Sequence, residues 1–503
     1  MVDAYTLHKP IRNRIRRFDR DALLDITMGA LLANEKDIIN TKGYIPWECM
    51  LLIRWILQYA QPGRHLKRPN TSTLNTLLND IKNLYDSAIR FNPSEPHGLH
   101  KFLRRLTYQQ FTYQMPLPEM GWRAGRQLIL FTQIGEQYHV NDVFEKEAGL
   151  SIKDFISISF AIFSILQSDD KYALEAETLF SIFHPDIVQK YFDLTAVNAI
   201  EAKRYLDADS KNKGKRFVLQ LYELSPLVRK PFYTAGSRYI LFSKRLFRQF
   251  FSHFIYDYLY SLPDSFSSFG SILEKYVRLQ LDAQELKPIL DKSWKKILKK
   301  PVSAPDFTIA QDCATTFIEV KRKHLPDISK VLQTNDTFSR HLDDSVVKGI
   351  VQIYSLANEL IINRPSEIKN FNNFYGVVVT YKDDHLRGGK QFWEEFLEKE
   401  VLKELKRLKI DSNIIPPENI FLLPIDEVDY LLAFLKKNSK HNFSTIFEKV
   451  KEYEANPATS KFFFHDHLQT ISGGQIPRPE HLWRKFTTIT DEMVEKLIKA
   501  KKT

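Results

Sequence analysis

Hydrophobic positions in the first part of the chain recur every three or four residues, the spacing that lines apolar side chains along one side of an α-helix. Clear examples are WECMLLIRWILQYA, LNTLLNDIKNLYDSAI and KYALEAETLFSIF, at residues 47–60, 74–89 and 171–183. Breaks with proline or glycine separate such segments, at residues 61–63, 92–93 and 116–118. The pattern predicts a helical domain over residues 1–205, for which sensing, partner binding and oligomerisation are the open alternatives.

The pattern changes after residue 205, where short runs of β-branched and aromatic residues alternate with helical segments. Residues 206–265 are predicted to form a basic connecting region with short strands and a helix. Residues 266–435 then indicate a helix, two short strands, a helix, a strand, and a last strand that runs into a helix. The near-continuous apolar strand at 374–381 is typical of a sheet covered by helices. Residues 436–503 are predicted to be polar and partly helical.

The two short strands carry the most informative residues of the chain. The run FTI directly follows Pro305-Asp306, and the run TTFIEV contains Glu319 and Val320 and leads to Lys321. The residues between the runs suit a turn, so the pattern predicts a hairpin with Asp306 on its first strand. Side chains alternate along a strand, which places Glu319 and Lys321 on one face and Val320 on the other.

Spacing alone does not single out this group, because a second one shares it. Pro185-Asp186 is followed by Glu201-Ala202-Lys203 at a similar separation. Here the apolar residues on both sides recur at helical spacing, so Asp186 and the Glu201–Lys203 group are predicted to lie on two helices. Side chains on two such helices have no reason to converge, which leaves the hairpin as the candidate site.

The hairpin and its flanking elements resemble the PD-(D/E)xK nuclease superfamily over residues 266–435. Length and hydrophobic pattern predict a multidomain protein with a mainly α-helical N-terminal half. The resemblance implies that an α/β restriction-endonuclease-like core, a mixed sheet flanked by helices, follows it. It also implies a phosphodiester hydrolase that depends on Mg²⁺, with Mn²⁺ as a substitute. The expected substrate is DNA.

The resemblance assigns roles to the residues of the hairpin. Asp306 and Glu319 would hold the metal, with the backbone carbonyl of Val320 as a further ligand, because Mg²⁺ prefers oxygen ligands. Lys321 would orient or activate the attacking water, or offset the charge of the transition state.

Two residues outside the hairpin complete the expected site. Glu274, on the helix before the hairpin, would contact the metal through water or help to bind a second ion. Gln352, on the helix after the hairpin, matches a glutamine that many such nucleases carry near the metal. The common Gln-x-x-x-Tyr spacing is not met, because Tyr354 follows Gln352 by only two residues.

The net charge of +11 is unevenly distributed, with basic clusters in residues 201–250 and just before the hairpin. Phosphate backbones attract such clusters without reading sequence. The candidate nucleic-acid contacts are Arg238, Lys244, Arg245, Lys292, Lys295 and Lys296. A solvated surface is the alternative for any single one of them. Five arginines, at positions 12, 14, 16, 17 and 20, form either a basic arm or the exposed edge of a helix.

Cysteine content and hydropathy bear on the compartment. Cys49 and Cys313 are too few for a disulfide framework or a cysteine-based zinc site of the usual form, which favours a reducing compartment. The N-terminal segment lacks the apolar core of a signal peptide. The longest apolar run, at 155–167, is too short to span a bilayer and is predicted to be a buried core helix. A soluble, cytoplasmic protein with no membrane partner is expected.

Functional alternatives follow from the same residues. A helical front half with a nuclease at the back is typical of bacterial anti-phage defence or restriction proteins, an analogy at the level of the fold alone. A catalytically inactive nuclease fold that binds nucleic acid or acts as a scaffold is the alternative, and an RNase of the same fold is a further one. A homo-oligomer and a separate partner protein are both compatible with the sequence.

Overall fold

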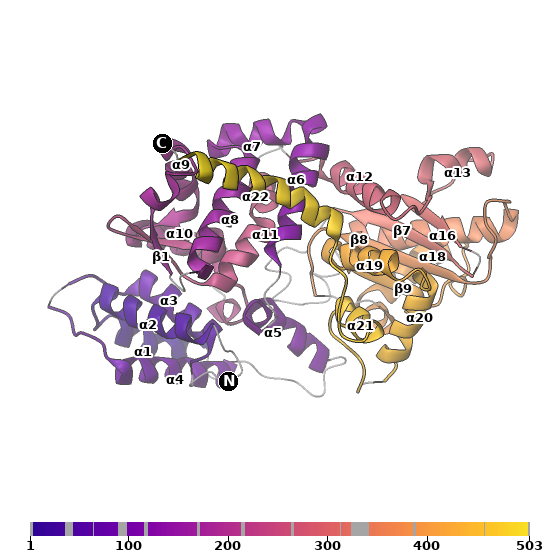
Figure 1. The fold of residues 1–503 in the computed structure, drawn as a ribbon. Coiled ribbons are helices and arrows are strands. Elements are labelled where there is room, and N and C mark those ends of the chain that lie inside the picture. The colour runs from indigo at the N-terminus through magenta and orange to yellow at the C-terminus, as the bar shows by residue number, and fades with distance from the viewer. Residues whose placement is uncertain are drawn as a thin grey trace. The chain divides into compact units, whose positions relative to one another are not determined.

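The computed structural model divides the chain into two compact units (Figure 1). The first unit comprises residues 1–124, 139–265 and 485–503, and the second comprises 125–138 and 266–484. The structure describes every residue except 1–3, 36–43, 64, 89–97, 115–118, 169–171, 213–216, 263–265, 312, 323–341, 386–388, 457 and 501–503. The chain is rich in helices and contains two mixed sheets, in agreement with the predicted mixture of a helical part and an α/β part.

The first unit is mainly helical. Its helices are α1 (Ala4–Ile15), α2 (Arg20–Asn34), α3 (Pro46–Tyr59), α4 (Thr71–Ala88), α5 (Gly98–Gln114), α7 (Val140–Ala148), α8 (Ile152–Ser168), α9 (Pro185–Thr195), α10 (Ala199–Asn212) and α11 (Lys244–Ser261), with short 3₁₀ helices η3 (Ala176–Leu179), η4 (Phe217–Leu221) and η5 (Pro226–Arg229). The bounds of α6 (Met120–Leu128) and α22 (Glu480–Ala500) fall in both units.

A small mixed sheet completes the first unit. Its strands are β1 (Ala173–Glu175), β2 (Ala196–Val197), β3 (Phe232–Ala235) and β4 (Arg238–Leu241), in the order β1-β4-β3-β2. Only the β2–β3 pair is parallel. Strands β1 and β2 lie within the region predicted to be helical, and two or three residues are too few to display an alternating pattern.

The apolar run at 155–167 forms most of α8, and its core residues are fully buried. This confirms the predicted buried helix. In the described part of the chain, one helix, Ser345–Asn363, is long and apolar enough to cross a membrane, and the bent pair α7–α8 passes the same test if taken as one span. More than half of the Ser345–Asn363 window is buried inside the protein, as is common for a core helix of a soluble protein.

The second unit is built on a five-stranded mixed sheet in the order β5-β6-β7-β8-β9. Its strands are β5 (Ile289–Leu290), β6 (Phe307–Ala310), β7 (Thr315–Lys321), β8 (Phe374–Thr380) and β9 (Ile420–Pro424). β5, β6 and β7 pair antiparallel, whereas β7, β8 and β9 pair parallel. Both faces of β8 are buried, as its continuous apolar sequence predicts.

Helices cover both faces of this sheet. They are α12 (Phe269–Asp282), α13 (Asp291–Ile297), α16 (Lys348–Asn363), α17 (Lys390–Phe392), α18 (Glu398–Leu408), α19 (Ile425–Lys437), α20 (Phe443–Glu454) and α21 (Phe464–Ile471), with shorter helical turns η1 (Ile129–Ile134), η2 (Gly135–Tyr138), η6 (Asp343–Val347), η7 (Trp393–Leu397) and η8 (Pro417–Asn419).

The pleat of the strands separates two cores within the second unit. Phe317 and Val378 point to one face and pack with apolar residues of α16 and α18. Phe421 points to the other face, where its ring stacks on Phe447 of α20 with centroids 4.2 Å apart. Residues 319 and 321 of β7 share the face of Phe317, so their side chains face α16.

Candidate active site

Two hydrogen bonds that run in opposite directions across the hairpin join Asp306 to Glu319 and to Val320. The backbone N–H of Asp306 donates to Oε2 of Glu319 at 3.1 Å, and the N–H of Val320 donates to Oδ2 of Asp306 at 2.7 Å. Asp306 lies in a bend directly before β6, and the prediction that placed it on the strand was wrong by one residue. The bend leaves its carboxylate free to reach the N–H of Val320.

Lys321 joins this pair from the same face of β7. Its Nζ donates to Oε1 of Glu319 and to Oε1 of Gln352, the latter at 3.2 Å. The side-chain amide of Gln352 in turn donates to the carbonyl of Ala304 at 3.3 Å. Gln352 therefore connects Lys321 to the segment that precedes Asp306. The structure thus brings together four of the predicted site residues, which are Asp306, Glu319, Lys321 and Gln352.

The two carboxylates lie in surroundings that disfavour their charge. Glu319 is only 2% exposed. Burial raises the pKa of Asp306 to about 7, and the neighbouring charge of Glu319 adds to this rise. Burial also raises the pKa of Glu319, although Lys321 acts in the opposite sense. One lysine thus faces the buried carboxylate of Glu319 and the half-buried carboxylate of Asp306, and a further cation would relieve their repulsion.

Glu274 acts on this pair electrostatically. It lies half-buried on α12, where burial raises its pKa, the charge of Asp291 raises it further and Lys292 lowers it. The charge of Glu274 raises the pKa values of both Asp306 and Glu319. Among the described residues, no three His, Cys, Asp or Glu side chains are grouped so as to hold a metal ion. Glu274 therefore acts on the pair through its charge.

Gly349 lets α16 approach the site, and the sequence analysis did not identify it. A Cβ at this position would lie 2.9 Å from Cγ of Glu319 and 3.2 Å from Cε of Lys321. The helix backbone therefore forms one wall against both side chains. A glycine inside an apolar helical pattern, three residues before Gln352, is the signal that points to such a close approach.

The structure separates the remaining candidates of the motif from the site. Tyr354 is fully buried, and its hydroxyl donates to the carbonyl of Ile415. The second Pro-Asp and Glu-x-Lys group lies on α9 and α10, as predicted. Its side chains bond to other neighbours: Glu201 accepts from the N–H of Asn198, and Lys203 pairs with Asp207.

The basic residues before the hairpin lie on α13, which is attached to the strand that follows Asp306. Trp294 is fully buried, and its Nε1 donates to Oγ1 of Thr308 at 3.2 Å. The N–H of Asp291 donates to the carbonyl of Asp306 at 3.2 Å. On the other side of this short helix, the predicted contacts Lys292, Lys295 and Lys296 are exposed.

The three predicted contacts in the first unit differ from one another. Arg238 is exposed on β4. The Nζ of Lys244 donates to the carbonyl of Leu166 at 2.7 Å, and the guanidinium of Arg245 is mostly buried. Internal contacts such as these argue against phosphate binding by Lys244 and Arg245.

The N-terminal arginines belong to a helix and its end. Arg12 and Arg14 lie on α1, where Arg14 pairs with Asp80 of α4. Arg20 begins α2 and pairs with the adjacent Asp21. Of the two interpretations left open by the sequence, these positions agree with the edge of a helix.

Comparisons with known proteins do not place the chain in a family. No protein-family model, no curated protein and no solved structure matches it.

Proposed function

We propose that this chain is a metal-dependent nuclease that hydrolyses phosphodiester bonds, built on a fold of the PD-(D/E)xK type. One observation carries the proposal: backbone hydrogen bonds across the hairpin hold the half-buried Asp306 beside the buried Glu319, and Lys321 contacts Glu319 on the same face. Two carboxylates and a lysine at one point supply metal ligands and a cationic group for a phosphate.

The donor set suits a hard divalent cation. Carboxylate oxygens are the ligands that Mg²⁺ prefers, and it is commonly bound by one or two of them with retained waters. Burial raises the pKa of Asp306 and the charge of Glu319 adds to the rise, and such an ion would offset both effects. Asp306 and Glu319 would hold it, with the carbonyl of Val320 as a further donor. When bound, Mg²⁺ polarises a phosphate and lowers the pKa of a coordinated water.

The protein groups have separate tasks in this proposal. Lys321 would hold the attacking water or a phosphate oxygen by hydrogen bonding, since its ammonium carries several donors. Gln352 would keep the ammonium in place through its 3.2 Å contact. Glu274 would add negative charge near the metal ligands and would contact the metal through a water molecule or help to bind a second ion.

DNA is the proposed substrate, and the exposed lysines of α13 support a phosphate backbone close to Asp306. A cytoplasmic role in bacterial anti-phage defence or restriction remains part of the proposal, on the fold-level analogy alone. Arg238 is retained as a candidate contact because its side chain is exposed.

Incubation of the purified full chain with supercoiled, linear and single-stranded DNA and with RNA, in Mg²⁺ or Mn²⁺, tests this function. We expect metal-dependent cutting of DNA that Glu319→Ala abolishes. Cutting of RNA alone would identify an RNase of the same fold. Binding without cutting under every divalent metal would establish the inactive, nucleic-acid-binding alternative. Undiminished cutting by Glu319→Ala would contradict the assigned site.

A further inference from the structure

A basic surface lies where two connecting segments of the first unit meet. Arg16 and Arg17 belong to the segment between α1 and α2, and Lys67 and Arg68 belong to the segment between α3 and α4. All four side chains are exposed. No aspartate or glutamate occurs in residues 5–18 or 60–79. Positive charge is therefore concentrated at this one place.

Backbone hydrogen bonds hold the two segments side by side. The N–H of Lys67 donates to the carbonyl of Arg17 at 3.1 Å, and the N–H of Asp19 donates to the carbonyl of Lys67 at 3.0 Å. The N–H of Arg20 donates to the carbonyl of Gln61 at 3.0 Å. These bonds belong to two parallel β-bridges between the segments. The fold thus brings together cations that lie some fifty residues apart in the chain, at positions 16–17 and 67–68.

The carboxylate that adjoins this surface is already engaged. Oδ1 of Asp19 accepts from the N–H of Ala22 at 2.9 Å and so caps α2, and its Oδ2 accepts from the N–H of Gly63 at 2.9 Å. These backbone donors keep the pKa of Asp19 below its ordinary value. The next carboxylate, Asp21, pairs with Arg20 at 2.8 Å. Asp19 therefore joins the two segments, and both of its oxygens are occupied in doing so.

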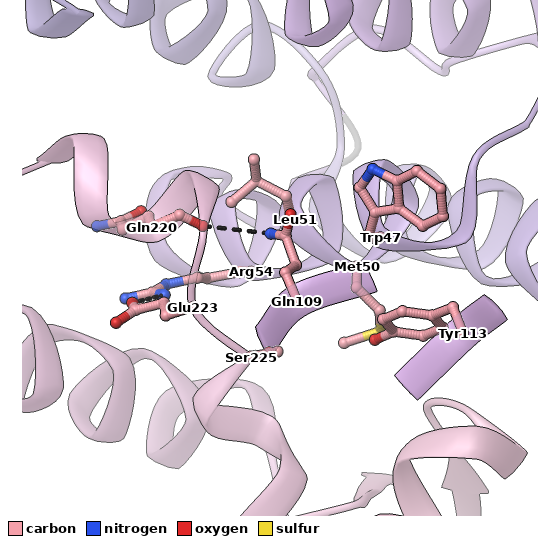
Figure 2. A pocket seen from close by; sticks show the side chains of 9 residues that line it. All are labelled: Trp47, Met50, Leu51, Arg54, Gln109, Tyr113, Gln220, Glu223 and Ser225. Atoms are coloured by element: carbon pink, nitrogen blue, oxygen red, sulfur yellow. Dashed lines mark hydrogen bonds and ion pairs between the residues drawn. The ribbon is translucent and has the colours of Figure 1, made fainter. Parts of the chain in front are cut away.

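Other arginines of the first unit have internal partners. Arg54 is 2% exposed and donates to Glu223 at 2.6 Å, as Figure 2 shows, and to Asp209 at 3.3 Å. Arg14 pairs with Asp80 of α4. In the described part of the chain, by contrast, the four side chains of the basic surface form no hydrogen bond and no ion pair. Their charges are available to a partner from outside.

The density of charge favours nucleic acid as that partner. Like charges that gather without a counter-ion repel one another, so a bound polyanion would stabilise the arrangement. Duplex DNA carries one negative charge per about 1.7 Å of its axis, whereas an extended acidic peptide carries at most about one per 3.3 Å. The planar guanidinium of arginine also matches the geometry of a phosphate group.

A membrane surface is the less favoured partner. Binding to lipid grows with the apolar area that enters the interface. Among the described residues of the two segments, 16–19 and 60–70, no large apolar side chain is exposed.

We propose that the basic surface of Arg16, Arg17, Lys67 and Arg68 binds the phosphate backbone of duplex nucleic acid without reading its sequence. The inference stands apart from the nuclease proposal, because it rests on side chains of the first unit and involves no cleavage. Of the alternatives left open for the helical unit, it selects partner binding, with nucleic acid as the partner.

Fluorescence anisotropy of a short labelled DNA duplex, titrated with the full chain in EDTA at several KCl concentrations, tests the proposal. The double variants Arg16→Ala with Arg17→Ala and Lys67→Ala with Arg68→Ala should each lower the slope of log binding constant against log salt concentration by about 1.8 in magnitude. All four substitutions together should lower it by about 3.6. The melting temperature should not fall, because these side chains have no internal hydrogen bond or ion pair to lose.

The double variant Lys146→Ala with Lys203→Ala is the matched control. It removes the same charge from the first unit, but these lysines pair with Glu147 and Asp207, so it should leave the slope unchanged. Absence of duplex binding at low salt would overturn the proposal. So would an unchanged slope in both double variants of the basic surface, or an equal fall in the control.

The same variants separate the other polyanions and the nuclease proposal. Polyglutamate and phosphatidylserine vesicles would be titrated in parallel, and we expect the four substitutions to matter most for the duplex. A loss of binding to either of these, with the duplex slope unchanged, would also overturn the proposal. Because binding is measured in EDTA, its failure would leave Mg²⁺-dependent cleavage as a separate result.

Discussion

Replacing Gly349 by alanine perturbs the proposed active site without removing any of its functional groups. The new Cβ would lie 2.9 Å from Cγ of Glu319, closer than ordinary contacts allow. Glu319 is 2% exposed and held by Asp306 and Lys321, so it has little room to retreat. Overpacking of this kind costs about 1–3 kcal/mol, whereas glycine to alanine within a helix gains roughly 0.5–1 kcal/mol. The net loss of stability is therefore about 0–2.5 kcal/mol.

The effect on cleavage should be larger than the effect on stability. A displacement of a catalytic group by about 1 Å can cost 10²-fold in rate. We expect Gly349→Ala to remain folded, as judged by circular dichroism and urea denaturation, and to cleave about a hundredfold more slowly. Gly29→Ala is the matched control, because Gly29 lies in α2 with open space where its Cβ would be. Cleavage by Gly349→Ala at the wild-type rate would refute the role given to this close approach.

Three further predictions concern the same site. Burial raises the pKa of Asp306 from an ordinary value of 3.8, so the proton that it holds when folded is lost as pH rises towards about 7. Between pH 3.8 and about 7, the free energy of unfolding of the wild type in EDTA should therefore fall relative to that of Asp306→Asn. A difference between the two proteins that stays constant with pH would contradict this prediction. Gln352→Ala should lower the cleavage rate about tenfold with little change in substrate affinity, and an unchanged rate constant would remove its role in holding Lys321. The double variant with Lys295→Ala and Lys296→Ala should bind DNA with a smaller salt dependence, because the slope of log binding constant against log salt concentration should fall by about 1.8 in magnitude. Lys440→Ala, which removes another exposed lysine, should leave this slope unchanged. An equal slope in both would place the DNA elsewhere.

Local patterns predicted the elements that carry the site, namely α12, the β6–β7 hairpin, α16, β8 and the strand β9 that leads into α19, whereas β5, α13 and α18 were not predicted. The apolar spacing at 269–282 and 348–363 is that of helices, and the continuous run at 374–380 is that of a doubly covered strand. The convergence of Asp306, Glu319 and Lys321 also followed from sequence, because a hairpin fixes which residues face one another.

Long-range contacts set the limit of such prediction. Whether a lysine faces solvent or an internal carbonyl is not encoded in its neighbours along the chain, and Lys244 contacts Leu166 from a segment 78 residues away. The approach of Gly349 to Glu319 depends on how α16 packs on β7. Strand β6 begins at Phe307, one residue after Asp306. The N–H of Val320 bonds to the side chain of Asp306 and not to its backbone carbonyl, so Asp306 does not extend the strand pairing.

The most direct test of the nuclease proposal compares two Glu-x-Lys groups in the same chain. Initial rates of DNA cleavage in Mg²⁺ would be measured for Lys321→Ala and for Lys203→Ala, with wild type in Mg²⁺ and in EDTA as references. Lys203 pairs only with its helical neighbour Asp207 among the contacts described, whereas Lys321 contacts Glu319 and Gln352. We predict Mg²⁺-dependent cleavage that Lys321→Ala abolishes and Lys203→Ala preserves. Equal rates for the two variants would contradict the assignment of the active site.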